Sequence, residues 1–120
     1  MKAQTLEKNF KKSLHPDIKD LIDISISNYS EENEIGKVTL LYDFEEKFEL
    51  GKQMYKDITW FCSNPKSKFS EATHSNNPNI LLLAVLSKEN GARTLKEINE
   101  NYNEFHDIVK FAIDIRNQNC

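Results

Sequence analysis

Apolar side chains recur every three or four residues along most of the chain, the spacing that places them on one face of an α-helix. Leu6, Phe10 and Leu14 show this spacing near the start. A second set follows Pro16, and proline suits the first turn of a helix because its missing N–H would have no helical partner there. The pattern predicts a first helix from Thr5 to about Leu14 and a second from Pro16 to Tyr29.

Residues 36–63 carry the longest apolar pattern, and it supports two interpretations. One continuous helical stripe comprises Leu40, Phe44, Phe48, Gly51, Tyr55, Ile58 and Cys62. Residues 37–50 also suit a β-hairpin, since Val38–Tyr42 contains good strand formers. Strict two-residue alternation is missing there because apolar residues are contiguous at 40–42. A long helix from Gly36 to Ser63 is therefore the favoured prediction.

The next segments predict a loop and then a buried helix. Residues 65–77 are the least regular part of the chain, with room for a short helical turn near Phe69–His74. Asn77 and Pro78 then form a typical helix start. Residues 80–86 are apolar on every side, so that helix must be buried on every side. We expect it to span 78–89, to end before Gly91, and to be the central element.

A long amphipathic helix is predicted for residues 94–116. Thr94 and Glu97 have the spacing of a capping box, in which each side chain satisfies a free backbone N–H at the helix start. Apolar positions then repeat at three and four residues, at Leu95, Ile98, Tyr102, Phe105, Val109, Ala112 and Ile113. This helix completes the predicted fold, an all-α, single-domain bundle of about five helices over residues 1–120.

Composition supports a small folded domain and excludes several classes of protein. The chain has 120 residues, of which 38% are hydrophobic and 29% charged, too apolar for a disordered chain. The longest apolar run, 80–86, is far shorter than the roughly 20 residues that cross a membrane. The N-terminal segment has no apolar signal region. We therefore expect a cytoplasmic protein without a membrane partner.

Charge is distributed unevenly along the chain. Residues 1–19 carry a net charge of +3, whereas residues 31–49 carry −5. Clustered charge of one sign raises the rate of encounter with a partner of the opposite sign. The glutamates expected to form a negative surface are Glu31, Glu32, Glu34, Glu45, Glu46 and Glu49. Trp60 falls off the apolar stripe and is added as a candidate contact, because tryptophan is enriched in binding interfaces.

The sequence contains no recognisable catalytic, metal or cofactor motif. Glu71 and His74 have the Glu-x-x-His form of helical di-iron sites, but such sites need two copies and further glutamates. Cys62 and Cys120 are too far apart in sequence for a zinc motif. Three isolated glycines cannot form a phosphate-binding loop. We expect a protein that is not an enzyme and that binds no metal and no cofactor.

One segment resembles a known DNA-binding family. Residues 80–102, ILLLAVLSKENGARTLKEINENY, resemble the first two helices of a winged helix-turn-helix domain. The resemblance implies a DNA-binding transcriptional regulator. However, the sequence shows no turn between residues 99 and 110 that would begin a separate recognition helix, and no glycine-rich wing follows. Residues 94–116 also have five acids against three bases, the wrong sign for contacts with phosphates.

These observations favour a small acidic binding protein. The most specific prediction is an immunity protein that neutralises a basic, nuclease-like bacterial toxin by pairing its glutamates with a Lys/Arg groove. This interpretation is associational, since small size and acidic character are shared by many proteins. A DNA-binding regulator is the second hypothesis, and a structural or oligomerising helical module is the third.

Overall fold

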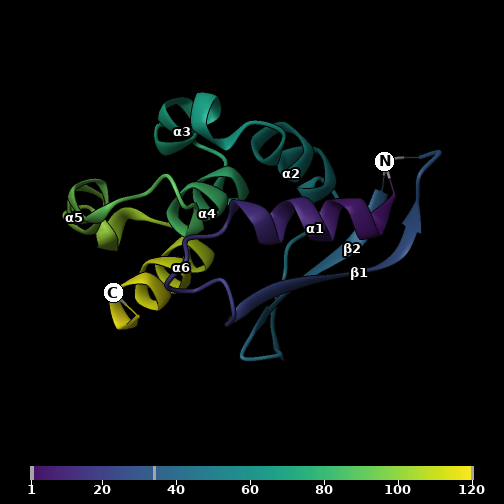
Figure 1. Cartoon of the computed structure of the whole chain (residues 1–120), viewed down its shortest axis with the longest axis horizontal. Helices are drawn as coiled ribbons and strands as arrows, with labels where there is room; N and C mark the ends of the chain where they lie inside the picture. Colours follow the sequence, from purple (N-terminus) through teal and green to yellow (C-terminus); the bar gives the residue numbers. More distant parts are fainter. Residues whose placement is uncertain (1, 34, 120) are drawn as a thin grey trace.

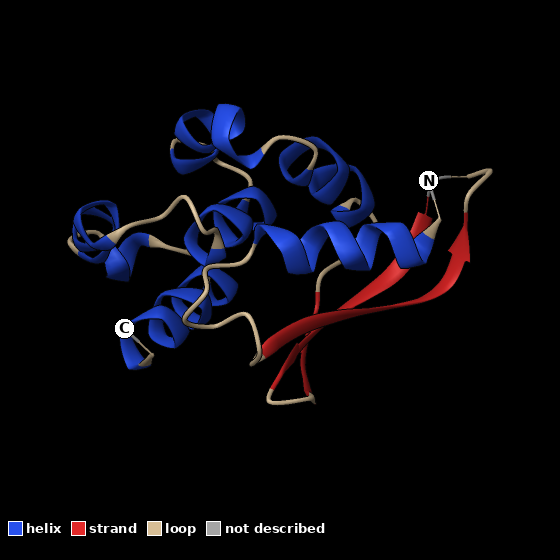
Figure 2. Ribbon diagram, in the orientation of Figure 1, coloured by secondary structure: helices blue, strands red, loops and turns tan. Residues whose placement is uncertain are grey.

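The computed structural model describes residues 2–33 and 35–119, and it is a mixed α/β fold. The predicted all-α bundle is therefore wrong, because residues 22–49 form a three-stranded antiparallel sheet of order β1-β2-β3 (Figure 2). The elements in chain order are α1 (Ala3–Ser13), β1 (Ile22–Ser30), β2 (Ile35–Tyr42), β3 (Glu45–Glu49), α2 (Met54–Cys62), α3 (Pro65–Thr73), α4 (Pro78–Leu86), α5 (Ala92–Asn99), the 3₁₀ turn η1 (Tyr102–Glu104) and α6 (Asp107–Gln118).

The predicted second helix is instead a short run of turns followed by β1. In β1, Ile22, Ile24 and Ile26 alternate with polar residues, and the first two are buried. Ile24 lies opposite Leu40 of β2 on the face that packs against the core. Ile22 and Ile26 are four residues apart and therefore also fit helical spacing, which explains the wrong prediction. The β-branched side chains and the period of two favour the strand.

The predicted long helix from Gly36 to Ser63 is also wrong, because it divides into β2, β3 and α2. Leu40 and Phe48 are eight residues apart, as two helical turns would place them, yet they face each other across the β2–β3 pair. Gly51, with φ of +81°, turns the chain from the end of β3 towards α2. The β-hairpin alternative for residues 37–50 is therefore the correct one.

The predicted helix over 94–116 is broken near its middle. α5 begins at Ala92 with Gly91 as its N-cap, so Thr94 does not cap it. η1 separates α5 from α6, and the His106 Nδ1 atom accepts a hydrogen bond from the Ile108 N–H at 3.2 Å. Histidine thus caps the start of α6, and the asparagine-rich segment before it ends α5.

Two predicted helices are confirmed. α1 matches the first, and α4 matches the central apolar helix although it ends earlier, at Leu86. Residues 82–86 of α4 are all buried, and the Asn77 side chain accepts from the Asn79 N–H at 3.0 Å, as expected of an N-cap. The segment expected to be irregular holds α3, which begins at Pro65.

The helices cover one face of the sheet and extend beyond it. α1 packs on β1 and α2, whereas α4 packs on α2, α3 and α6 (Figure 1). Phe111 of α6 contacts the rings of Tyr42 and Phe48, with centroids 6.0 and 5.0 Å away, and so joins the helices to the sheet.

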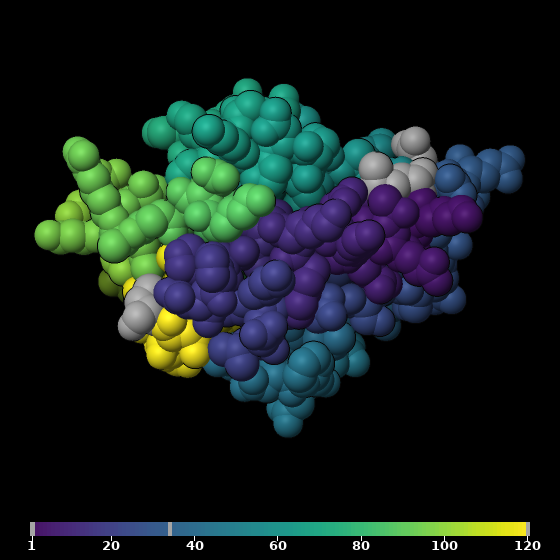
Figure 3. Space-filling view, in the orientation of Figure 1, coloured from purple at the N-terminus to yellow at the C-terminus, as the bar shows by residue number. Residues whose placement is uncertain are grey.

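Backbone hydrogen bonds join the segment after α1 to the end of α4. Leu14 and Ser87 form an isolated antiparallel bridge. The His15 N–H donates to the Leu86 carbonyl at 2.9 Å, and the Lys88 N–H donates to the Ser13 carbonyl at 2.8 Å. Figure 3 shows this N-terminal segment crossing the middle of one face of the molecule, between the green helices and the blue strands. Contacts distant in sequence therefore hold the sheet and the helices together.

Candidate protein-interaction surface

The turn between β2 and β3 presents an aromatic side chain to solvent. Asp43 and Phe44, its two central residues, both have positive φ, 53° and 67°, as a type I′ hairpin turn requires. Phe44 is 74% exposed. A bulky residue in left-handed backbone costs of order 1–3 kcal/mol, and at this exposure little apolar burial offsets that cost. Phe44 is therefore the residue in this turn whose presence folding explains least.

Neighbouring contacts hold the hairpin in place from below. The Asp43 N–H donates to the Leu21 carbonyl at 2.7 Å, which ties the turn to the start of β1. Tyr42 and Phe48, one on each strand, pack on Phe111 of α6. The turn is thus anchored on its core side, and the Phe44 ring projects from an ordered support. We call residues 43–46 the hairpin tip.

Acidic residues flank Phe44 along the edge strand. Glu45, Glu46 and Glu49 are all exposed. Glu45 and Glu49 have nearby ammonium groups, with Lys47 Nζ 3.5 Å from Glu45 Oε2 and Lys37 Nζ 3.9 Å from Glu49 Oε2. Glu46 makes no ion pair with any residue that the structure describes. Within the described residues, Asp43 and Glu46 are therefore the acids of the hairpin tip that form no ion pair.

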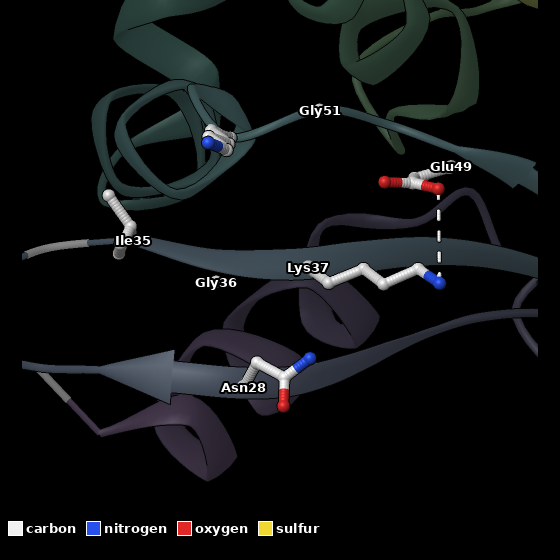
Figure 4. Close-up of a pocket in the computed structure, with 7 residues that line it drawn as sticks. Asn28, Ile35, Gly36, Lys37, Glu49 and Gly51 are labelled. Carbon is white, nitrogen blue, oxygen red and sulfur yellow. Dashed lines mark ion pairs between the residues drawn. The ribbon is translucent and has the colours of Figure 1, made fainter.

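The edge of the sheet also contains a hollow, shown in Figure 4. β3 pairs with β2 only from Thr39 to Tyr42, so the start of β2 runs beyond the end of β3. A cavity of about 200 Å³ lies there, bordered by Ile35, Lys37 and the Glu49–Lys52 segment. Lys37 reaches across it to Glu49, as the dashed line in Figure 4 marks. The charged groups that line this hollow are Lys37, Glu49 and Lys52.

The structure divides the predicted acidic residues into two groups. Glu45, Glu46 and Glu49 lie together on the hairpin, whereas Glu31 and Glu32 lie in the turn between β1 and β2. Glu31 and Glu32 precede the start of β2, whereas Glu45 and Glu46 lie opposite its end, roughly 23 Å away at 3.3 Å per residue. Glu49 lies opposite Thr39, in the middle of β2. Glu34 lies outside the described residues. The described glutamates of this set thus belong to two separate parts of the sheet, and their role in binding a partner stays a prediction.

Trp60 is on α2, away from the glutamates. It lines a second hollow together with Asp57 and His74, and the Lys68 ammonium lies 5.1 Å from its ring centroid. The structure thus separates Trp60 from the hairpin tip. The residue that sequence reasoning missed is Phe44, which its spacing had assigned to the core. The missed signal was the pair Asp43-Phe44 between two strand-like segments.

The candidate chemical groups, Cys62 and the Glu71/His74 pair, lie at the ends of different helices, α2 and α3. Burial raises the pKa of the Cys62 thiol to about 11, so the thiol is protonated and unreactive at neutral pH. His74 lies with its Nδ1 atom 2.8 Å from the Ser70 carbonyl. No group of three or more His, Cys, Asp or Glu residues suitable for a metal is found among the described residues. Cys120 lies outside them.

The segment that resembles a winged helix-turn-helix does contain a break, contrary to the sequence prediction, and α6 follows it. A recognition helix must expose a face to the DNA groove. In α6, however, only Asp107, Asn117 and Gln118 are exposed. Arg116 is 1% exposed, and its guanidinium binds the carbonyls of Val85 and Asn90. The polar face of this helix therefore carries Asp107 and Asp114 against Lys110, and it is not basic.

None of the helices in the described part of the chain has the length and apolar character needed to cross a membrane. Comparisons with protein-family models, with curated proteins and with solved structures find no match for this chain. The side chains of the hairpin tip are distinguished by an exposed aromatic ring in left-handed backbone.

Proposed function

We propose that this chain is a protein-binding module that docks onto a basic partner through its hairpin tip. In its most specific form, the proposal is that it acts as an immunity protein and inhibits a basic, nuclease-like toxin. The observation that carries the proposal is the position of Phe44, 74% exposed in left-handed backbone. Strained residues persist where function uses them.

The hairpin tip has the composition of a small interface anchor. An exposed aromatic ring supplies a large apolar area that a partner's pocket would bury. Asp43 and Glu46 stand on either side of the ring in sequence and carry negative charge. Charged residues around an aromatic anchor steer the encounter and fix its orientation. The partner that fits this arrangement has an apolar pocket rimmed by Lys and Arg.

Inhibition follows from the same chemistry. A nuclease holds phosphates in a groove lined with Lys and Arg, and those side chains supply much of its affinity for nucleic acid. A negative hairpin seated at such a groove would compete with the phosphates for the same cations. This mechanism needs no reactive group on the inhibitor, only a projecting, correctly charged tip.

Cross-linking at the tip tests the proposal directly. A photoreactive phenylalanine analogue placed at position 44 should cross-link a protein of the native lysate that is rich in Lys and Arg. In pull-down assays, Phe44→Ala should weaken binding of that protein by about tenfold or more, since anchor residues contribute at least 2 kcal/mol. Adding the captured protein's nucleic-acid substrate should compete with the interaction.

Matched controls separate the tip from general charge. Glu46→Gln should slow association and reduce its dependence on salt, whereas Glu7→Gln on α1, outside the hairpin, should change neither. The proposal is wrong if Phe44→Ala and Glu46→Gln both leave capture of the cross-linked partner unchanged. The immunity role alone fails if the partner binds through the tip and yet has no toxic or nuclease activity that this chain suppresses.

A further inference from the structure

A second hollow lies on the helical side of the molecule, between α2 and the α3–α4 connection. Its volume is about 480 Å³, and its walls include Asp57, Trp60, Glu71 and His74. We call it the α2–α3 pocket. The proposed function does not use it, because the hairpin tip is formed by other elements of the fold.

Asp57 is the unusual residue of this pocket. It is only 8% exposed, and its carboxylate oxygens accept hydrogen bonds from two neutral amides, Asn77 Nδ2 at 3.2 Å and Asn79 Nδ2 at 3.3 Å. No ion pair joins it to any described residue. Burial raises the pKa of Asp57 even though both hydrogen bonds oppose that shift. A buried carboxylate satisfied only by amides lacks a counter-charge, which is costly in a protein interior.

The other walls of the pocket also suit a cation. The ring of Trp60 already has the Lys68 ammonium 5.1 Å from its centroid, and indole faces attract cations. His74 also lines the pocket, with its Nδ1 atom 2.8 Å from the Ser70 carbonyl. Glu71 adds a carboxylate at the exposed rim. Lys56 is the single positively charged side chain among the lining residues.

We propose that the α2–α3 pocket binds an organic cation with several N–H donors, a guanidinium or a primary alkylammonium group. Asp57 is its counter-ion, the ligand's charge takes the place of the Lys68 ammonium at the Trp60 ring, and Glu71 accepts a further hydrogen bond. A divalent metal ion does not fit, because no three metal-ligating side chains cluster within the described residues. A guanidinium fits better, since its N–H groups spread over several acceptors.

Asp57 also has a structural role. It links α2 to the first turn of α4 through Asn77 and Asn79, and Asn79 Nδ2 further donates to the Leu50 carbonyl at 3.2 Å. Asp57 also lies in the first turn of α2, where the positive end of the helix dipole stabilises a negative charge. The test must therefore measure ligand binding and folding separately.

Trp60 is the single tryptophan of the chain, so its fluorescence reports on the α2–α3 pocket alone. The probe is Nα-acetyl-L-arginine amide, and its control is the citrulline analogue, which has the same shape without the charge. The arginine probe should change Trp60 emission with saturation, and the citrulline analogue should bind about tenfold or more weakly, as loss of a charged hydrogen bond implies. Agmatine serves as a second probe. Tighter binding of agmatine would indicate a free small molecule as the ligand, and tighter binding of the arginine probe would indicate a peptide side chain.

Variants complete the test. Asp57→Asn and Glu71→Gln should each weaken the arginine probe, Asp57→Asn by about tenfold, whereas Glu46→Gln at the hairpin tip should not. Circular dichroism checks that each variant is folded, and the exposed Glu71 gives a variant that leaves the Asp57 contacts intact. Equal binding of the arginine and citrulline probes, or unchanged binding in both pocket variants, would overturn the proposal. Either result leaves the role of Phe44 untouched.

Discussion

The guanidinium of Arg116 donates a hydrogen bond to the main-chain carbonyl of Val85 over 2.9 Å, and so fastens α6 to the C-terminal end of α4. The same guanidinium donates to the Asn90 carbonyl at 2.7 Å. Both carbonyls lie just where α4 ends and the chain turns towards α5. Helix C-termini leave carbonyls without intrahelical partners, and a cation there also complements the helix dipole.

Replacing this arginine should destabilise the fold. Arg116→Met keeps much of the side-chain volume but leaves two buried carbonyls without these donors, so we expect a loss of about 2–4 kcal/mol in the free energy of unfolding. Urea denaturation measures it. Arg93→Met is the matched control, because the Arg93 side chain is 95% exposed and pairs with Glu97 on the surface of α5. That variant should change stability by less than about 0.5 kcal/mol.

Glycine at the hairpin tip should have the opposite effect. Phe44→Gly removes an aromatic side chain from left-handed backbone at φ of 67° and loses little burial, so we expect a gain of about 1 kcal/mol. Thermal unfolding measures it. The same variant should bind the partner poorly, which would show that stability is given up for binding. Glu45→Gly, in the strand next to the turn, should instead lose about 0.5–1 kcal/mol.

A side chain at Gly36 should displace its neighbours. A Cβ built there lies 3.1 Å from Tyr29 Cδ2 and 3.2 Å from Ile26 Cγ2, closer than ordinary contacts. Gly36→Ala should therefore displace Tyr29 and destabilise the protein by about 1–3 kcal/mol, as chemical denaturation would reveal. At Gly91, the N-cap of α5, nothing lies within 4 Å of the built Cβ. Gly91→Ser should be neutral or slightly stabilising, because serine is a preferred N-cap; a similar loss at both sites would contradict the steric explanation.

Asp57 should make stability depend on pH. Burial raises its pKa in the folded protein above the ordinary value of 3.8, so the unfolded chain releases this proton more readily. The contribution of Asp57 is then fully present below the unfolded pKa and is lost as pH rises through the folded pKa. The unfolding free energy of the wild type, relative to that of Asp57→Asn, should therefore fall as the pH rises from about 3 to about 7. A difference that is constant with pH would show that the pKa is not raised.

Sequence patterns located the helices well where only one period fits. α4 is apolar on all sides and follows an Asn-Pro start, and no strand interpretation competes with it over that length. α1 likewise has a clear four-residue spacing. In the sheet region both periods fit. Residues paired across β2 and β3 lie three and five positions apart next to the turn and eight and ten apart beyond the bulge, and separations of three and eight also occur on one face of a helix. Leu40 and Phe48 show this coincidence directly.

The candidate site was only partly predictable for the same reason. The acidic character of Glu45, Glu46 and Glu49 is visible in the sequence, but their union on one hairpin depends on the register of β2 with β3. The exposure of Phe44 depends on the turn position, which lacks the glycine that usually marks such turns. Asp57 drew no attention because its surroundings come from residues twenty positions away in the chain.

The bridge between Leu14 and Ser87 bears on how the chain acquires its fold during synthesis. Helix α1 and the strands emerge from the ribosome first, yet the segment that clasps residues 13–15 is made more than seventy residues later. Closing so long a loop is entropically unfavourable until the partner strand exists. The N-terminal half therefore lacks these contacts until residue 88 has been translated and has left the exit tunnel. Until then, the nascent sheet can mispair or bind a chaperone.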